Sequence, residues 1–418
     1  MWNNCTAFAS WAGDLHGLSA GGSLLRANLA TMQAQPGQWL LQQDVELGSG
    51  GYGRVVQASD KISGRTAAAK VISTQRMKLA AIKKEISLMA QLKHPNIIEL
   101  LGYEEKNEQK RFIIYMELAG GGELFSRVIN AGTLEEDVAR PFFTQLMSAV
   151  QYMHSVGCVH RDLKLVRVQR HGQPLLDLIL EAAATDVCSL VAQENILLDT
   201  EDNCKVCDFG LAHVYDVDPN KQIVLTKLRE ICGSKSYCAP EVLEGRGYEG
   251  FPTDVWSCGI CLFAMLAGFF PLDEASGSDW RFERVKLAAS QGCSTAHTIF
   301  GFYDRPCNLS PDVTDLIDSM LMIDPVRRLS VEHTLQSPWV CGTGKVKGMD
   351  IDHSYSNRPV YRGLHGSGLT PEALAAMYEA EGNGSSRPVY RGGPPLGPPP
   401  PLRKQEVMFC DEFHLQDA

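Results

Sequence analysis

The sequence has fewer basic than acidic residues, with 39 Lys and Arg against 49 Asp and Glu and a formal net charge of −10. Proteins that bind nucleic acids or anionic membranes usually carry a clustered basic surface. The shortage of positive charge therefore argues against both kinds of partner. It is typical of a chain that binds soluble proteins or metabolites.

The sequence also lacks an apolar run long enough to cross a bilayer. The longest run, from Cys258 to Pro271, is shorter than the ~20 residues that a membrane-spanning helix needs, so we expect a buried helix there. The 13 cysteines are scattered along the chain and form no short secreted framework. These absences favour a reducing compartment, cytoplasmic or nuclear.

Charge is almost missing from the first 43 residues, which contain only Asp14 and Arg26 as charged side chains. An organelle transit peptide would be rich in Arg, so this stretch matches one poorly. We expect residues 1–40 to be a leader without stable structure, or to include residues upstream of the true start codon.

A length of 418 residues suggests two or three domains. Residues 41–118 have the pattern of a small lobe, in which short strands surround one helix at Met77 to Leu92. Asp60 to Gly64 supplies a hairpin turn. The strands are expected at Val45 to Leu47, Val55 to Ser59, Thr66 to Ile72, Ile97 to Tyr103 and Phe112 to Glu117. An antiparallel sheet follows from this order.

Residues 119–340 have the pattern of a larger, mostly helical lobe. Thr133 and Glu136 have the spacing of a capping box, and apolar residues then recur at about every fourth position from Val138 to Met153. Pro141 falls inside that helix, where it removes a backbone hydrogen bond. The two patterns together predict an α+β fold with sheet and helices in separate lobes.

Residues 341–418 are rich in Gly and Pro and have the composition of a tail, with a short helix expected near 370–381. The hexapeptide that starts at Arg358 recurs from Arg387, either as a docking peptide or as part of a solvated linker. The prolines at 394–401 suggest a weak ligand for an SH3 or WW domain.

The chemistry begins with a glycine-rich loop, in which Gly48, Gly50 and Gly53 match Gly-x-Gly-x-x-Gly-x-Val. Glycines let backbone amides approach phosphates closely because no Cβ stands in the way. A dinucleotide fold would place a helix directly after the loop, but a β-type run follows here. Lys70, 17 residues after Gly53, and Glu85 on the next helix suit a phosphate-binding ion pair.

Three further motifs follow in a fixed order: His160 to Lys164, Asp208 to Gly210, and Ala239 to Glu241. With the glycine-rich loop they make residues 44–340 resemble a eukaryotic protein kinase of the Ser/Thr type. The segments 119–125 and 337–339 are similar to the calcium/calmodulin-dependent kinase group. The resemblance implies a sheet N-lobe with one main helix, a helical C-lobe, and transfer of phosphate from ATP with Mg²⁺ to protein Ser or Thr.

The resemblance also implies roles for single residues. Asp162 would be the catalytic base, Lys164 and Lys70 would contact phosphate, and Asn195 and Asp208 would bind Mg²⁺. Met116 would be the gatekeeper beside adenine, and Glu123 would reach the ribose. The full set implied for the nucleotide is Leu47, Gly48, Gly50, Gly53, Val55, Ala68, Lys70, Glu85, Met116, Glu117, Ala119, Glu123, Leu197 and Asp208.

The catalytic loop departs from the family pattern, in which an Asn follows the Asp after five residues. Here the fifth residue after Asp162 is Arg167, and the first suitable Asn is Asn195. Removing the 28 residues from Val166 to Gln193 would restore an unbroken motif. We interpret 166–193 as an insert in the catalytic loop, and we expect it to impair activity because catalysis by positioning fails when catalytic groups shift by about 1 Å.

Three readings of this insert remain open. It could be a regulatory insertion, or the mark of a pseudokinase that binds nucleotide and acts only as a scaffold. It could also be a retained intron, because 28 codons keep the reading frame, Val codons begin with GT, and one Gln codon ends in AG. We favour the retained intron.

Regulation by phosphorylation is also expected from the resemblance. Arg161, directly before Asp162, would pair with a phosphate on the segment between Asp208 and Glu241. Thr226 is the leading acceptor, ahead of Ser234 and Ser236, for an upstream kinase or for autophosphorylation.

Overall fold

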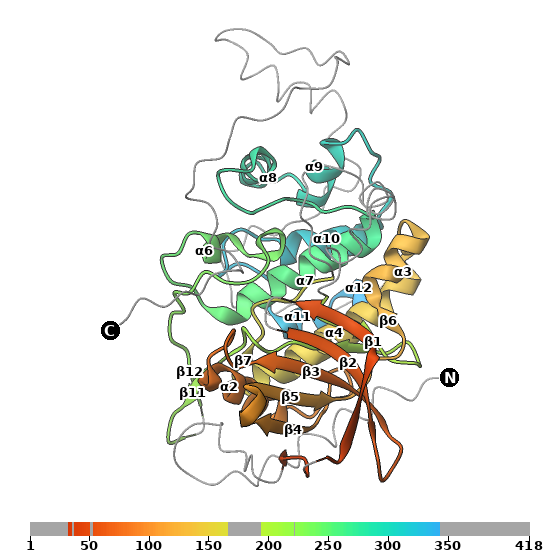
Figure 1. Cartoon of the computed structure of the whole chain (residues 1–418). Helices are drawn as coiled ribbons and strands as arrows, with labels where there is room; N and C mark the ends of the chain where they lie inside the picture. Colours follow the sequence, from red (N-terminus) through yellow and green to blue (C-terminus); the bar gives the residue numbers. More distant parts are fainter. Residues whose placement is uncertain (1–31, 36, 51–52, 166–193, 221, 343–418) are drawn as a thin grey trace, which may run out of the picture.

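The N-terminal part of the described chain contains a five-stranded antiparallel sheet in the order β1-β2-β3-β5-β4 (Figure 1). The computed structural model describes residues 32–35, 37–50, 53–165, 194–220 and 222–342. The strands are β1 Trp39–Gly50, β2 Gly53–Asp60, β3 Thr66–Ser73, β4 Leu100–Lys106 and β5 Arg111–Met116. The predicted small antiparallel sheet is confirmed.

Two strand boundaries differ from those expected. β1 begins at Trp39 and not at Val45, because the Trp39 ring stacks on Tyr115 with 4.9 Å between ring centroids. β4 begins at Leu100 and not at Ile97. Ile97 and the residue after it pair instead with Val206 of the other lobe, which removes them from the sheet.

The helix α2, Leu79–Gln91, lies within the predicted range Met77 to Leu92. Its buried side chains recur every three or four residues, as expected for a helix with one face against a sheet. Glu85 is the charged member of that face and is 3% exposed. A carboxylate is buried only where a partner compensates its lost hydration, and the partner lies on β3.

The larger, C-terminal part of the described chain is mostly helical and lies above the sheet in Figure 1. Its helices are α3 Leu124–Ala131, α4 Glu136–Ser155, α6 Pro240–Leu243, α7 Gly250–Ala267, α8 Trp280–Ser290, α9 Thr295–Gly301, α10 Pro311–Met320, α11 Val331–Leu335 and α12 Pro338–Cys341. Serine side chains that accept from a backbone N–H begin α9 to α12. The predicted two-lobed α+β fold is therefore present.

The central helix α7 meets the length and composition of a membrane span, but 89% of it is buried inside the lobe. This agrees with a core helix in the predicted region. α4 packs against α7, and the helix continues unbroken through Pro141.

The predicted capping box at Thr133 is wrong. α4 starts at Glu136, and no side chain caps it through a hydrogen bond. The Glu136 carboxylate instead accepts from the Ser310 hydroxyl at 2.7 Å and from the Trp339 indole N–H at 2.8 Å. It thus joins the start of α4 to the end of the helical lobe, which leaves it unavailable as a local cap.

Short strands place the loops between the lobes. β6 Gly122–Glu123, β8 Ile196–Leu198 and β9 Cys204–Val206 form one small sheet, and β7 Cys158–Val159 pairs with β10 His213–Val214. β11 Asp216–Val217 pairs with β12 Ile223–Val224. The 3-10 turns are η3 Asn107–Gln109 and η5 Lys235–Tyr237. Asp162 follows β7, Asn195 precedes β8 and Asp208 follows β9.

Candidate active site

One face of the sheet gathers several of the residues predicted for nucleotide binding. Val55 lies directly opposite Lys70, and Ala68 lies opposite Met116 in the next strand pair. Residues opposite each other, and residues two apart on one strand, share a face. Val55, Ala68, Lys70 and Met116 therefore share one face of the sheet, and Gly53 and Gly48 join it through the same register.

Lys70 connects the two lobes. Its Nζ lies 2.7 Å from Glu85 Oε1 on α2 and 3.0 Å from Asp208 Oδ1 in the helical lobe. Burial alone would lower the pKa of Lys70, but the two carboxylates outweigh it and raise the pKa. The Lys70 ammonium lowers the pKa of Asp208 to about 2. The cation and the Asp208 carboxylate are thus both charged at neutral pH.

Asp208 is held in an unusual backbone conformation, with φ of 63°. The next side chain, Phe209, is 2% exposed and packs edge to face on His160 at 5.2 Å between ring centroids. His160 Nε2 lies 3.1 Å from the carbonyl oxygen of Cys207. These contacts fix the turn that aims the Asp208 carboxylate at Lys70.

Asp254, buried in α7, holds the backbone of the catalytic loop. Its carboxylate accepts from the N–H groups of His160 and Arg161, each at 2.9 Å, and lies 3.0 Å from His154 Nε2. Arg161 has a left-handed backbone with φ of 69°. Such a conformation costs about 1–3 kcal/mol in a non-glycine residue and persists only where neighbours enforce it, which Asp254 does here.

The carboxylate of Asp162 is a convergence point for three side chains. Oδ2 accepts from Lys164 Nζ at 2.7 Å and from Asn195 Nδ2 at 2.9 Å. Oδ1 accepts from the Ser234 N–H at 3.0 Å and from its hydroxyl at 3.1 Å. The structure therefore brings the predicted base, the predicted phosphate contact and the predicted metal ligand together.

The two ends of the interrupted loop meet. The Asn195 N–H donates to the Lys164 carbonyl at 3.2 Å. If Leu165 were joined directly to Glu194, Asn195 would be the third residue after Lys164, and this would be the closing hydrogen bond of a β-turn. Both ends thus keep the geometry of an uninterrupted loop, while residues 166–193 lie outside the described part of the chain.

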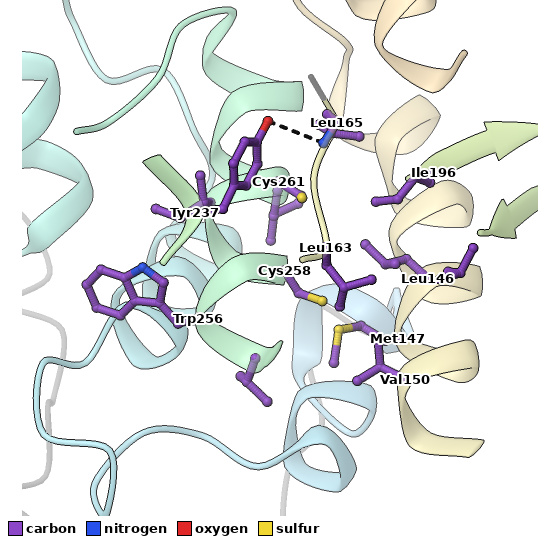
Figure 2. Packing of buried hydrophobic residues seen from close by; sticks show 14 of the residues in the cluster. Leu146, Met147, Val150, Leu163, Leu165, Ile196, Tyr237, Trp256, Cys258 and Cys261 are labelled. Carbon is purple, nitrogen blue, oxygen red and sulfur yellow. Dashed lines mark hydrogen bonds between the residues drawn. The ribbon is translucent and has the colours of Figure 1, made fainter. Parts of the chain in front are cut away.

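Apolar anchors hold both ends in place. Figure 2 shows Leu163 between Cys258 of α7 and the α4 side chains Leu146 and Met147, and Leu165 farther along the loop beside Tyr237. Leu163, Leu165 and Ile196 are fully buried. The Leu165 N–H also donates to the Tyr237 hydroxyl at 3.2 Å. Leucine burial of this kind is worth about 1.5–3 kcal/mol per side chain.

The segment after β5 presents backbone toward the predicted adenine position. The Glu117 side chain is directed elsewhere, because Oε1 pairs with Lys205 Nζ at 2.6 Å. The backbone N–H of Glu117 donates to the Glu99 carbonyl. The backbone carbonyl of Glu117 and the N–H of Ala119 are left to bind the adenine base. Leu47 lies in an irregular stretch of β1 and is 44% exposed, so the sheet encloses this predicted contact only in part.

Glu123 and Leu197 are cross-strand partners in the small sheet of β6, β8 and β9. Burial, and the hydrogen bond that joins it to Glu123, raise the pKa of Glu194 to about 10. Burial also raises the pKa of Glu123. Glu194 therefore keeps its proton at neutral pH beside the predicted ribose position.

Two functional contacts were not expected in these roles. Ser234 was predicted as a possible phosphate acceptor, and its hydroxyl instead donates to Asp162. Glu194 was treated only as the end of the insert, although it directly precedes Asn195 and pairs with Glu123. Neither role has a signal in spacing along the chain, because both partners are brought near by folding.

These groups define a phosphoryl-transfer site between two lobes. A comparison with protein families matches residues 41–168 and 191–340 to the protein kinase domain. The chain belongs to the protein kinase family. The stretch that separates the two matched parts lies inside 166–193.

Curated plant kinases resemble this chain over most of its length. CBL-interacting protein kinase 26 of Oryza sativa subsp. japonica is 31% identical over 349 residues, which cover 82% of this chain and 60% of that protein. CBL-interacting serine/threonine-protein kinase 5 of Arabidopsis thaliana is 34% identical over 299 residues, which cover 70% of this chain and 56% of that protein. The chain thus spans little more than half the length of these relatives.

Proposed function

We propose that this chain transfers the γ-phosphate of MgATP to Ser or Thr hydroxyls of protein substrates. The observation that carries this proposal is the arrangement around Asp162, where Lys164, Asn195 and Ser234 all contact one carboxylate. A carboxylate so oriented can receive the proton of a substrate hydroxyl, and the Lys164 cation beside it can stabilise the transferring phosphate.

Lys70 is placed to bind the α and β phosphates of ATP. Its charge is maintained by Asp208 and Glu85, and its stem shares a sheet face with Ala68 and Met116, which can enclose the adenine ring. Positioning and charge stabilisation supply most of the catalysis of phosphoryl transfer. The ion pairs across the lobes therefore align the donor with Asp162.

The donor set fits Mg²⁺, which prefers oxygen ligands. Lys70 contacts Oδ1 of Asp208, so Oδ2 is the oxygen to offer a metal. Asn195 Nδ2 donates two hydrogen bonds to Asp162, which directs the opposite atom, Oδ1, away from Asp162. Bound Mg²⁺ would neutralise charge on the phosphates.

We propose that the interruption at 166–193 leaves this machinery intact. Support comes from the hydrogen bond between Asn195 and Lys164 and from the buried leucines on one side of the break. The closure entropy of a longer loop grows only slowly with its length. The competing function is a nucleotide-binding scaffold without catalysis.

The test compares four proteins on a basic Ser-containing peptide: the full chain, the chain lacking Val166 to Gln193, and Asp162→Asn in each. We expect phosphate transfer by both parents, with rates that differ by less than about 100-fold, the loss that a 1 Å misplacement can cause. Asp162→Asn should lower kcat at least about 100-fold. A full chain no faster than its Asp162→Asn variant would refute the proposal, and if the shortened chain were also inactive the scaffold would be favoured.

The origin of 166–193 has its own test. We propose a retained intron, which predicts a second transcript shorter by 28 codons. Amplification across the codons for Lys164 to Glu194 would detect it. A single long product in every tissue would contradict this origin and leave an inserted segment.

Partners and location remain proposals. The names of the relatives state that they interact with CBL, and we propose a regulatory protein partner for this chain as well. The repeated hexapeptide and the Pro-rich SH3 or WW ligand lie in 343–418, outside the described residues. We propose a cytoplasmic or nuclear location for the protein, which fits the proposed protein substrates.

A further inference from the structure

Arg161 pairs with a carboxylate, although its place before Asp162 suggested a phosphate as its partner. Its side chain is 7% exposed, its Nη1 lies 2.9 Å from Glu230 Oε2, and its Nε donates to the Leu211 carbonyl at 2.7 Å. The backbone of Arg161 is held by Asp254. The guanidinium is therefore fixed on both sides, and Glu230 satisfies its charge.

A further cation acts on the same carboxylate. Lys84 on α2 joins Arg161 in lowering the pKa of Glu230, with the Arg161 hydrogen bond as the largest cause. Burial raises the pKa of the neighbouring Cys232 thiol, so that group adds no competing negative charge at neutral pH. Glu230 is thus stabilised as a carboxylate by positive charges from both lobes.

The main chain around Glu230 is also anchored. Its carbonyl accepts from the Tyr248 hydroxyl at 2.8 Å. Leu228, two residues before it, exchanges two backbone hydrogen bonds with Tyr248, each at 2.9 Å. The segment therefore enters the site in one conformation.

A short path leads from Glu230 to the catalytic carboxylate. Gly233 has φ of 95°, and a Cβ there would lie 2.5 Å from the Arg161 carbonyl oxygen, so only glycine permits this approach. The next residue, Ser234, donates its N–H and hydroxyl to Asp162. Arg161 is thus contacted by the segment at Glu230 and again at Gly233, immediately before the contact with Asp162.

We propose that Glu230 is a positioning residue whose permanent carboxylate orders the segment from Asp208 to Glu241 without phosphorylation. It acts through Arg161 and keeps Ser234 on Asp162. A phosphate on Thr226, four residues earlier, is then not required for order. This inference rests on the proposed kinase function only in its effect on rate, because the order of the segment can be measured directly.

The test measures hydrogen exchange of backbone amides in the full chain treated with phosphatase. In Glu230→Gln, which removes only the charge, the amides of Ser234 and Tyr248 should exchange about fivefold faster, as expected for the loss of one partly exposed ion pair. Glu230→Asp should recover part of the protection. The matched control is Glu244→Gln, because Glu244 pairs with Arg246 at the surface and should leave exchange unchanged.

Two results would overturn the inference. One is equal exchange in Glu230→Gln and the unsubstituted chain, both folded by circular dichroism. The other is loss of protection in the unsubstituted chain after phosphatase treatment, which would assign the order to a phosphate.

Kinetics separate positioning from nucleotide binding. Glu230→Gln should lower kcat about fivefold and leave the KM for MgATP within about twofold, because Lys70 and Asp208 are untouched. An equal loss in Glu244→Gln would count against a specific role. If the full chain shows no kinase activity at all, the proposed function fails, while the exchange experiment still decides the role of Glu230.

Discussion

At the scale of single residues, the buried carboxylates of the site have partners that offset the cost of burial. Buried Glu85 pairs with Lys70, which also pairs with the more exposed Asp208. The buried Asp162 carboxylate accepts four hydrogen bonds, from three side chains and one backbone N–H. Glu194 is the exception. It is 8% exposed and lies beside another carboxyl, so it keeps its proton.

This protonated carboxyl predicts a specific pH dependence of stability. Between the ordinary pKa of 4.5 and the folded value of about 10, Glu194 is neutral in the folded chain and ionised in the unfolded chain. The unfolded state then binds fewer protons than the folded state. The free energy of unfolding of the chain therefore falls as pH rises through this window. Glu194→Gln should remove that decline and stabilise the chain by about 1–2 kcal/mol at pH 8.

Urea unfolding at pH 5, 7 and 9 measures this effect. Glu201→Gln is the control, since Glu201 is exposed and its substitution should leave the pH profile unchanged. A profile of Glu194→Gln parallel to that of the unsubstituted chain would contradict a protonated Glu194.

At the scale of elements, the glycines of the β1–β2 hairpin are under different steric constraints. A Cβ on Gly53 would lie 1.9 Å from the Val71 carbonyl oxygen, so glycine is required there for the close approach of β2 and β3. At Gly48 a Cβ would meet nothing within 4 Å. The same motif therefore contains one glycine needed for packing and one that is sterically free.

We expect Gly53→Ala to destabilise the sheet lobe by about 1–3 kcal/mol, the usual cost of overpacking. Gly48→Ala should stay within about 0.5 kcal/mol of the unsubstituted chain. Thermal unfolding of the two variants would measure both changes in stability. Equal destabilisation by the two substitutions would mean that the strand contact at Val71 does not limit the position.

At the scale of the whole molecule, polar contacts join the two lobes at and near the site. Lys70 bonds to Asp208, and the Ile98 N–H donates to the Val206 carbonyl at 2.9 Å. A ligand that contacts both Lys70 and Asp208 would bind only the folded chain. Such a ligand stabilises by mass action, by about 2.7 kcal/mol at 100 times its Kd.

We therefore expect MgATP at saturation to raise Tm by about 5 °C or more. ATP with EDTA should raise it less, and Asp208→Asn should lose the difference between the two conditions, because this carboxylate is the expected metal ligand. Differential scanning fluorimetry makes the comparison. An equal rise with and without Mg²⁺ in the unsubstituted chain would contradict a metal ligand at Asp208.

Much of this architecture was predictable from local patterns. Strand and helix positions in the sheet lobe followed from periodicity, and Lys70, Asp162 and Asp208 followed from ordered motifs. The start of α4 was not predictable, because Glu136 forms hydrogen bonds with Ser310 and Trp339, which lie far away in the chain. The predicted start of β4 was wrong for a similar reason, since Ile97 and Ile98 pair with the other lobe.

The sequence by itself determined the family pattern, the order of its motifs and the boundaries of the interruption at Leu165 and Glu194. Only the tertiary structure decided that Asn195 returns to Lys164, that Ser234 bonds to Asp162 and that Glu230 meets Arg161. Motifs record which residue types lie near one another along the chain. These contacts join residues that are distant in sequence, so they depend on how buried leucines and α7 fold the loops together.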